Sequence, residues 1–287
     1  MSIDLIQERL NSYKCQSVQE EENAIREIAQ EIVLGGLSRT GFFKYAAFQG
    51  GTCLRMIYGL ERFSEDLDFV LVERDKNFDL NHYLEGLNLE LKAYGFDFNL
   101  KDRKDVQETV QKQFVKDDSL VKLIHFKHFK PGKDTKSIRI KIEIDTNPPA
   151  GSKFETKYHD FPFVYEVALQ DMPSLFASKN HALLCRVYVK GRDWYDFIWY
   201  VSRKSQINFK LLRAAIDQQG PWKGRGLGAD RKWYLTEMEK RIKQINFDEA
   251  RNDVKRFIRP NELASLEFWN TGFFLDRLDK LSQHLKQ

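Results

Sequence analysis

The segment from Ser137 to Thr146 constrains the fold of this chain more than any other part of its sequence. Four isoleucines at alternate positions are interleaved with charged residues, which are Arg139, Lys141, Glu143 and Asp145. Successive side chains of a β-strand point to opposite faces, so this segment has one apolar face and one charged face. The pattern predicts a strand.

Helical and extended patterns alternate on both sides of this strand. Helices are expected over Ser17–Gly35, where Gly35-Gly36 ends the pattern, after the double glycine at positions 50–51, and over Phe78–Tyr94. Further strands are expected over the segment DLDFVLV, Phe96–Leu100, Val106–Val115 and Phe163–Leu169.

From Pro173 onward the pattern is helical throughout. The expected helices are Pro173–Val187, Arg192–Ser202, Phe209–Gln218, Arg231–Ile245, Phe247–Phe257 and Phe273–Leu285. We therefore expect an α+β fold, with a mixed-sheet domain over residues 1–170 and an all-helical domain over residues 171–287.

The first group of candidate functional residues is a glycine turn followed by a pair of acids. Gly50, Gly51 and Thr52 lie directly ahead of a helical pattern, where glycine lets the backbone approach a phosphate and the threonine hydroxyl and free N–H groups can bind it. Asp66 and Asp68 then occupy alternate positions of a strand, so their carboxylates lie on one side and can hold Mg²⁺. An isolated Asp-x-Asp is often only a solvated pair, but this order of turn, helix and strand favours a site.

A third carboxylate commonly completes a two-metal site for phosphoryl transfer. Glu143 and Asp145 both lie on the charged face of the alternating strand, and the residues alone leave both open. Arg139 and Lys141 share that face, so an ordinary solvated strand surface with internal ion pairs is the structural alternative.

A second group lies on the expected helices after Pro173. Lys179 and Arg186 are seven residues apart, so they share a helix face and can present two cations to triphosphate oxygens. Asp193 and Asp196 are three apart on the next helix and therefore neighbours. The structural alternative for Asp193 is an acid favoured by the dipole at a helix N-terminus.

The segment FQGGTCLRMIYGLERFSEDLDFVL resembles the nucleotidyltransferase signature, and more narrowly the AbiEii/AbiGii toxin family of abortive-infection systems. The resemblance implies a minimal, polymerase-β-like nucleotidyltransferase fold. It implies that Asp66 and Asp68 are catalytic and bind Mg²⁺, with Mn²⁺ as the alternative, and it favours Glu143 as the third metal ligand. Gly50, Gly51, Thr52 and Ser64 would then lie near the nucleotide.

The resemblance continues in the helical region, where the family pattern is a lysine, an arginine and then Arg-Asp-x-Tyr-Asp. The matching residues are Lys179, Arg186, Arg192, Asp193, Tyr195 and Asp196. It implies that Lys179 contacts the phosphates of the nucleoside triphosphate (NTP), that Arg186, Arg192 and Asp196 belong to the substrate site, and that Asp193 has a catalytic or site-ordering role.

These residues together predict transfer of a nucleotidyl group from an NTP to an RNA acceptor, with tRNA as one candidate. The resemblance implies a toxin of a toxin–antitoxin or phage-defence system, with a cognate antitoxin. The alternatives are nucleotidylation of a protein or small molecule, and a non-catalytic regulator that binds nucleotide or RNA.

Charge distribution adds one expectation about the acceptor. Between Val201 and Pro260 there are 15 lysines and arginines against 7 acids, and this basic stretch could hold RNA phosphates. Trp222, between cations on a glycine-rich loop, could stack on a base, although a solvated loop is the plainer interpretation. The charged N-terminal segment and the absence of a long apolar run predict a cytoplasmic protein without a membrane partner.

Overall fold

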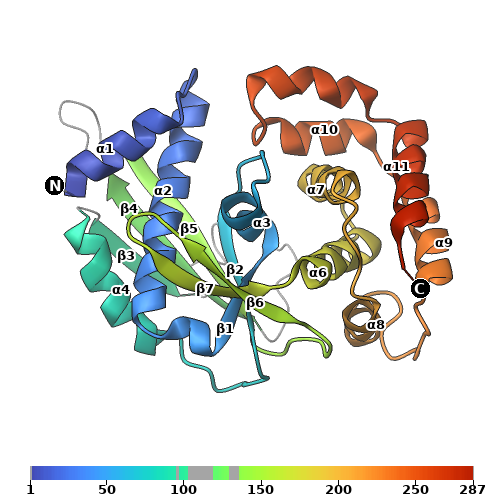
Figure 1. Cartoon of the computed structure of the whole chain (residues 1–287), viewed down its shortest axis with the longest axis horizontal. Coiled ribbons are helices and arrows are strands. Elements are labelled where there is room, and N and C mark those ends of the chain that lie inside the picture. Colours follow the sequence, from blue (N-terminus) through green and yellow to red (C-terminus); the bar gives the residue numbers. More distant parts are fainter. Residues whose placement is uncertain (1, 95–96, 103–118, 129–135, 287) are drawn as a thin grey trace. The chain divides into compact units, whose positions relative to one another are not determined.

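The computed structural model describes residues 2–94, 97–102, 119–128 and 136–286 (Figure 1). The chain divides into two compact units. The sheet unit comprises Met1–Gly59, Phe63–Pro148 and Glu155–Leu169, and the helical unit comprises Leu60–Arg62, Pro149–Phe154 and Gln170–Gln287. The predicted strand Val106–Val115 lies outside the described residues.

The described part of the sheet has the strand order β3-β4-β5-β2-β1-β7-β6. β2 runs parallel to β5 and β1 parallel to β7, whereas the pairs β1–β2, β3–β4 and β4–β5 are antiparallel. The sheet is therefore mixed, as predicted. The strands are β1 (Ala46–Gln49), β2 (Asp66–Leu71), β3 (Asp97–Asp102), β4 (Ser119–His128), β5 (Lys136–Asp145), β6 (Phe154–His159) and β7 (Tyr165–Gln170).

The central strand β2 has the two faces that its sequence predicts. Leu67 and Phe69 are buried, whereas Asp66 and Asp68 are half-buried on the opposite side. Phe69 packs edge-on against Phe42 with ring centroids 4.9 Å apart and lies beside Phe48. This aromatic burial fixes the strand's register, because a slip of one residue would exchange the two faces.

The helices of the sheet unit are α1 (Ser2–Ser12), α2 (Val18–Arg39), α3 (Gly50–Tyr58) and α4 (Asn81–Ala93), with the short 3₁₀ turn η1 (Phe42–Lys44). The prediction that Gly35-Gly36 ends a helix is wrong, because α2 continues to Arg39. A Cβ on Gly36 would come within 2.7 Å of a Leu87 methyl group on α4, and one on Gly35 within 3.2 Å of the Tyr165 ring. The two glycines therefore allow close packing.

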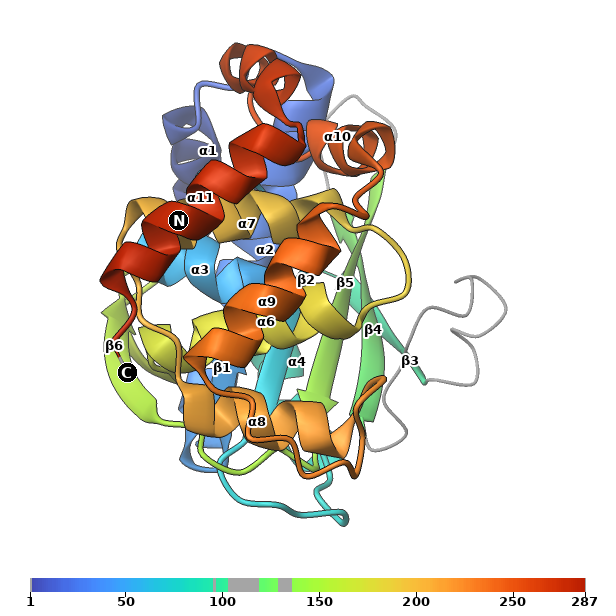
Figure 2. The same ribbon diagram turned by 90° about the vertical axis from the view of Figure 1, so that its right-hand side faces the viewer.

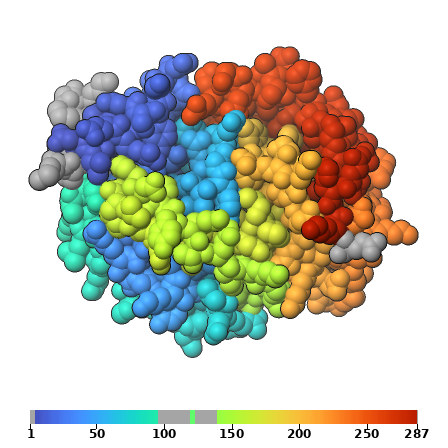
Figure 3. Space-filling view, viewed as in Figure 1, coloured from blue at the N-terminus to red at the C-terminus, as the bar shows by residue number. Residues whose placement is uncertain are grey.

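Five described elements of the sheet unit have no counterpart among the predictions, namely α1, η1, β1, β4 and β6. β6 carries Glu155, Thr156, Lys157 and Tyr158 on a largely exposed strand, in a segment that the sequence indicates only as polar and turn-rich. It lies at the edge of the sheet and is visible in yellow-green on the surface in Figure 3. Phe154, Thr156 and Tyr158 alternate with charged or polar residues, but this face is only partly apolar and mostly exposed, so the signal is weak.

The helical unit is helical where the sequence predicts it to be. Its elements are α6 (Met172–Cys185), α7 (Gly191–Ser202), α8 (Phe209–Gln218), α9 (Arg231–Ile242), α10 (Phe247–Lys255), the 3₁₀ segment η2 (Pro260–Phe268) and α11 (Thr271–His284). Figure 2 shows them in yellow to red. Asparagine or aspartate residues cap five of the helices, at Asp171, Asn208, Asp230, Asn246 and Asn270.

The core of the helical unit joins α6 and α7 through stacked aromatic rings. Phe176 and Tyr200 have ring centroids 4.2 Å apart and planes inclined by only 12°. Trp194 of α7 meets Phe274 of α11 edge to face. Packing of this kind holds the polar face of α7 in a fixed orientation toward α6.

Candidate functional site

The sheet unit carries a carboxylate face, formed by Asp66 and Asp68 of β2 and Glu143 of β5. In the parallel pairing of these strands, Asp68 is opposite Glu143 and Asp66 is opposite Lys141. Residues paired in this way point to the same side of a sheet. The three acids predicted from sequence therefore lie on one face, with the Lys141 ammonium among them.

Lys141 neutralises part of this face. Its Nζ lies 2.6 Å from a Glu143 carboxylate oxygen, and both side chains remain partly exposed. Burial alone would lower the pKa of Lys141, but Glu143, Asp66 and Asp68 together raise it. The Glu143 carboxylate is attracted by the Lys141 ammonium and repelled by the carboxylates of Asp66 and Asp68.

The three acids do not converge on one point. Among the described residues, no group of three His, Cys, Asp or Glu side chains is arranged to hold a metal ion. The donor set nevertheless fits a hard cation, because Mg²⁺ prefers carboxylate oxygens and commonly uses only one or two of them besides substrate phosphates. Asp66 and Asp68 supply those two.

Asp145 lies farther along the same strand face and has other contacts. It pairs with Val70 in the sheet, two residues beyond Asp68, and is 5% exposed. One of its carboxylate oxygens accepts a hydrogen bond from the Asn147 backbone N–H at 3.1 Å. Register and burial thus separate Asp145 from Asp66 and Asp68, whereas Glu143 is next to Asp68.

The predicted glycine turn packs against the carboxylate face. Gly50 has a φ of +79°, and a Cβ at this position would overlap Asp68 Oδ2 and come within 3.0 Å of Asp68 Cβ. Only glycine fits this approach without strain. Gly50 and Gly51 begin α3, so the start of that helix lies directly beside the Asp68 side chain.

Thr52 and Ser64 have structural contacts within the sheet unit. The Thr52 hydroxyl donates to the Asp66 backbone carbonyl, and the residue is 1% exposed. This differs from the prediction that the hydroxyl binds phosphate, because the hydrogen bond ties α3 to β2 and buries the hydroxyl. Ser64 is half-buried, and its carbonyl accepts a hydrogen bond from Gln30 Nε2 at 3.4 Å.

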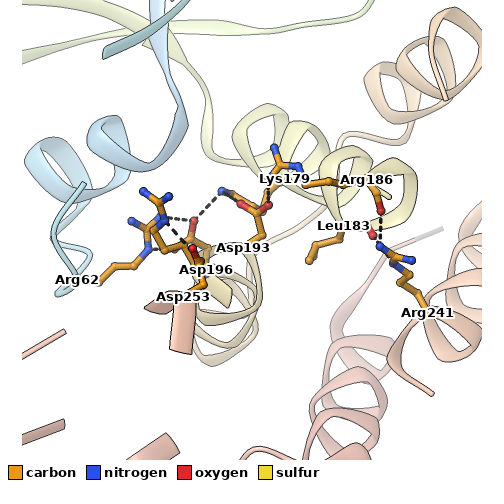
Figure 4. Close-up of polar contacts among 9 residues, drawn as sticks. Arg62, Lys179, Leu183, Arg186, Asp193, Asp196, Arg241 and Asp253 are labelled. Carbon is orange, nitrogen blue, oxygen red and sulfur yellow. Dashed lines mark hydrogen bonds and ion pairs between the residues drawn. The ribbon is translucent and has the colours of Figure 1, made fainter. Parts of the chain in front are cut away.

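The helical unit contains a buried network of ion pairs, which we call the α6–α7 network (Figure 4). Lys179 Nζ lies 2.8 Å from Asp193 Oδ1 and 2.7 Å from Asp196 Oδ2. Arg186 contacts the other oxygen of Asp193. The sequence prediction that Asp193 and Asp196 are neighbours is confirmed, and both acids meet the same lysine.

Arg62 completes this network from the short segment Leu60–Arg62 that belongs to the helical unit. Its guanidinium binds Asp196 through two hydrogen bonds of 2.6 Å each, in the bidentate form that arginine favours. Arg62 is 2% exposed and Asp196 is fully buried. Asp196 therefore has no surface with which to contact a substrate, contrary to its predicted place among the substrate-binding residues.

Cations exceed acids in the network. Burial by itself would raise the pKa of Asp193, but Lys179, Arg186 and Lys190 hold it well below its usual range. Burial lowers the pKa of Lys190, which makes no hydrogen bond or ion pair through its ammonium in the described part of the chain. Four cations thus surround two carboxylates, which leaves a positive surplus.

Arg192 is directed away from Asp193. Its Nε lies 3.6 Å from Asp253 of α10, and its guanidinium stacks over the Phe257 ring at 4.1 Å. The backbone N–H of Arg192 also donates to Asp253 at 3.1 Å. The arginine predicted to bind substrate therefore joins α7 to α10.

Sequence reasoning missed three contributors to the helical site. Arg62 was visible in the Arg-Phe-Ser-Glu-Asp-Leu-Asp motif, yet no spacing rule relates it to Asp196, which is 134 residues away. Lys190 precedes the Arg-Asp motif by one glycine. Arg241 of α9 donates to the backbone carbonyls of Leu183 and Arg186 and thereby holds the end of α6, where Arg186 lies.

A separate groove of about 850 Å³ lies between α9 and α11. Its lining includes Leu235, Leu275 and Leu278 together with charged residues such as Asp230 and Asp279. None of the residues predicted from sequence to be functional lines it. The groove is therefore separate from the residues predicted to bind the metal ion and the nucleotide.

The mixed sheet, its carboxylate face and the glycine turn beside Asp68 are features that fit the nucleotidyltransferases as a class. A comparison with protein-family models places the chain more narrowly. The model of the nucleotidyl transferase AbiEii toxin of type IV toxin–antitoxin systems matches residues 32–276. The chain belongs to this family, so it is a nucleotidyltransferase, and the resemblance detected in the sequence is confirmed.

One solved structure adds a likeness of fold. JHP933 from Helicobacter pylori is 16% identical, with a TM-score of 0.50, and the match covers 92% of this chain and 91% of JHP933. A second H. pylori structure, described as that of a candidate nucleotidyltransferase, is 15% identical over 88% of this chain and 90% of its own, with a TM-score of 0.46. No curated protein matches the chain. Among the described helices, none is both long and apolar enough to cross a membrane.

Proposed function

We propose that this toxin uses Mg²⁺ to transfer a nucleotidyl group from an NTP to a hydroxyl of an RNA acceptor. The observation that carries the proposal is the register of β2 and β5, which puts Asp66, Asp68 and Glu143 on one face beside the glycine turn. A cluster of acids at a phosphate-binding turn is what metal-assisted phosphoryl transfer needs.

Asp66 and Asp68 would hold the metal ion, and Glu143 would complete the set in preference to Asp145. Bound Mg²⁺, or Mn²⁺ in its place, supplies charge neutralisation at the triphosphate and lowers the pKa of the attacking hydroxyl. Once its carboxylate has separated from the Lys141 ammonium, Glu143 would accept the proton of that hydroxyl, whose oxygen attacks the α-phosphorus as the α–β phosphoanhydride bond breaks and pyrophosphate leaves. Gly50 and Gly51 offer backbone N–H groups to the phosphates at the start of α3.

The helical domain, residues 171–287 in this proposal, supplies the cations of the same reaction. Lys179, Arg186 and Lys190 bind triphosphate oxygens, because the α6–α7 network has more cations than acids. Asp193 orders Lys179 and Arg186 through direct ion pairs. Asp196 and Arg192 position other parts of the helical unit and do not contact the substrate. Asp196 is buried against Arg62, and Arg192 contacts Asp253.

RNA is the acceptor that the charge distribution favours. The stretch from Val201 to Pro260 carries 15 basic residues against 7 acidic ones. A protein or small-molecule acceptor would need no such surplus of cations, whereas a regulator that binds RNA without turnover would share it and is distinguished by the absence of transfer. We further propose that the protein acts in the cytoplasm, with tRNA as a candidate acceptor, and that a cognate antitoxin restrains it, as in phage-defence systems.

A labelling assay tests this proposal directly. Purified protein is incubated with each α-³²P-labelled NTP, Mg²⁺ and total RNA, in parallel with Asp66→Asn and with Glu73→Gln, an exposed acid two residues beyond β2. We expect label in a discrete RNA band, lost by at least about 10²-fold in Asp66→Asn and retained in Glu73→Gln. Label confined to protein or a small molecule, or absent altogether, would refute an RNA acceptor.

Growth provides an independent test of the toxin role. Expression of the wild-type chain should arrest growth, and Asp66→Ala should relieve the arrest. Arrest that persists in Asp66→Ala at equal protein levels would show that toxicity does not depend on the carboxylate face.

A further inference from the structure

We infer that the loop between α8 and α9, together with the start of α9, forms a platform for single-stranded RNA. The platform comprises Trp222, Lys223 and Arg225 of the loop and Lys232 and Trp233 of α9. This inference rests on the proposed function and extends it. It names the surface that would bind the RNA acceptor.

Two tryptophans form the centre of the platform. The rings of Trp222 and Trp233 meet edge to face, with centroids 5.1 Å apart and planes at 78°. Both residues are half-buried, so part of each ring remains at the surface. Aromatic faces that remain accessible can stack on nucleobases of any sequence.

The cations of the platform are not neutralised by acids. Lys223, Arg225 and Lys232 are exposed and make no ion pair within the part of the chain that the structure describes. The neighbouring carboxylates are engaged elsewhere, since Asp217 accepts the Gly226 N–H and Asp230 accepts the Trp233 N–H. The cations are therefore available to an anion.

Some other exposed cations of the helical unit are paired with acids, whereas Lys204, Lys210 and Arg213 are exposed and form no ion pair among the described residues. Lys240 pairs with Glu237 at 2.7 Å, Lys243 with Glu239 at 2.5 Å, and Lys280 with Asp276 at 2.9 Å. Each of these pairs lies within one turn of a single helix, as on an ordinary solvated helix face. What distinguishes the platform is that its unpaired cations lie on the same loop and helix start as two partly exposed tryptophan rings in contact with each other.

The loop is held in shape by its own backbone. Gly224 N–H donates to the Asp217 carbonyl at 2.8 Å, and Arg225 N–H to the Trp222 carbonyl at 3.1 Å. Figure 2 shows the loop running beside α8. The side chains that would meet the ligand thus project from an ordered turn, which reduces the entropy cost of binding.

The chemistry of the platform matches a polynucleotide strand. A single strand repeats one flat base and one phosphate per nucleotide, and the loop presents Trp222, then Lys223, then Arg225 in sequence. Stacking and phosphate contacts are the two terms that dominate binding of single strands. An acidic protein surface would use the cations but would have less use for the two ring faces.

The test is fluorescence anisotropy of a labelled single-stranded RNA oligomer with the full chain, without NTP, over a range of salt. We expect Trp222→Ala to weaken binding about 10-fold, and Trp222→Phe to retain most of the affinity because it keeps a stacking face. The double variant Lys223→Ala/Arg225→Ala should reduce the slope of log K against log salt by about 1.4.

The control is Lys240→Ala/Lys243→Ala, which removes the same charge from paired positions on and beside α9. The inference is overturned if this control weakens RNA binding as much as the platform double variant, or if Trp222→Ala binds RNA as tightly as the wild type. Thermal unfolding of each variant separates loss of contact from loss of fold, and Trp222→Phe keeps the test decisive if Trp222→Ala unfolds.

Failure of the platform and failure of the proposed function give different results. Transfer of label to RNA with unchanged binding by the Trp222 variants would refute the platform alone. Binding that depends on Trp222 without any transfer to RNA would support the platform and refute RNA as the acceptor.

Discussion

The carboxylate face of the sheet unit and the α6–α7 network of the helical unit are opposite in both charge and burial. The carboxylate face has three acids and one lysine, and its Lys141–Glu143 pair is partly exposed. The network has four cations and two acids, and its Arg62–Asp196 pair is almost completely buried. Half-exposed acids attract a metal ion, whereas a buried network with surplus cations is a rigid frame that favours anions.

This difference predicts that the same kind of substitution has opposite consequences in the two regions. An acid of the carboxylate face can change without loss of folding, because water replaces its contacts. An acid of the network cannot, because a buried charge that loses its partner keeps the full cost of desolvation. Activity should therefore depend on the first region and stability on the second.

The largest expected effect on stability is that of Asp196→Ala. Removal of this carboxylate leaves Arg62 buried without its bidentate partner, and breaking a buried ion pair costs about 3–5 kcal/mol. Glu143→Ala is the matched change on the carboxylate face and should cost less than about 1 kcal/mol, because its pair with Lys141 is partly exposed. Urea unfolding followed by circular dichroism measures the free energy of unfolding of both variants. Equal losses of unfolding free energy would contradict the difference between the two regions.

The next effect concerns the glycine turn. Gly50→Ala should destabilise the protein by about 1–3 kcal/mol more than Gly59→Ala, because only at Gly50 would a Cβ overlap Asp68. Both glycines have positive φ values, +79° and +75°, so the backbone strain is matched. Nucleotidyl transfer should fall in Gly50→Ala and persist in Gly59→Ala. If both variants lose activity equally, displacement of Asp68 is not the cause.

A third prediction concerns the effect of Lys141 on metal binding at the carboxylate face. Lys141→Met removes a positive charge from among three acids, so a divalent cation should bind more tightly, by about 10-fold for a unit charge a few ångströms away. Arg139→Met, an exposed cation two residues earlier on β5, should change the affinity little. Titration with Mn²⁺ observed by electron paramagnetic resonance measures both variants. Weaker Mn²⁺ binding in Lys141→Met would contradict a cation site on this face.

The smallest effect is a pH dependence in the network. Cations hold the pKa of Asp193 below its usual value of 3.8, so its stabilisation is complete above that pH and is lost as the pH falls through lower values. The difference in unfolding free energy between the wild type and Asp193→Asn should shrink by about 1 kcal/mol per pH unit below pH 4. A difference that grows on acidification would show that burial, which raises the pKa, outweighs the cations.

The sequence predicts the elements that have a periodic apolar face. Ile140, Ile142 and Ile144 are fully buried in β5, and Leu67 and Phe69 are buried in β2. The helices of residues 171–287 were predictable for the same reason. The sequence does not reveal β6, whose apolar face is short and mostly exposed. It also does not reveal the continuation of α2, because packing against Leu87 overrides the tendency of Gly36 to end a helix.

The candidate site was predictable where its residues are close in sequence. Asp66, Asp68, Gly50 and Gly51 were found by spacing, and the β2–β5 register distinguishes Glu143 from Asp145 in a way that spacing cannot. The partnership of Arg62 with Asp196 is a tertiary contact that no local pattern encodes. The contacts of Thr52 and Asp196 were not predictable for the same reason, because each side chain is buried against a partner that is distant in sequence.

The central proposal is that binding of a metal-bound NTP depends on the carboxylate face and also on the cations of the α6–α7 network. Calorimetric titration of each NTP with Mg²⁺ into the wild type, Asp68→Asn and Lys179→Met tests it most directly, with circular dichroism as a check on folding. We expect both substitutions to weaken binding of the NTP, and Asp68→Asn also to remove its dependence on Mg²⁺. Binding of every NTP to both folded variants as tightly as to the wild type would contradict the proposal.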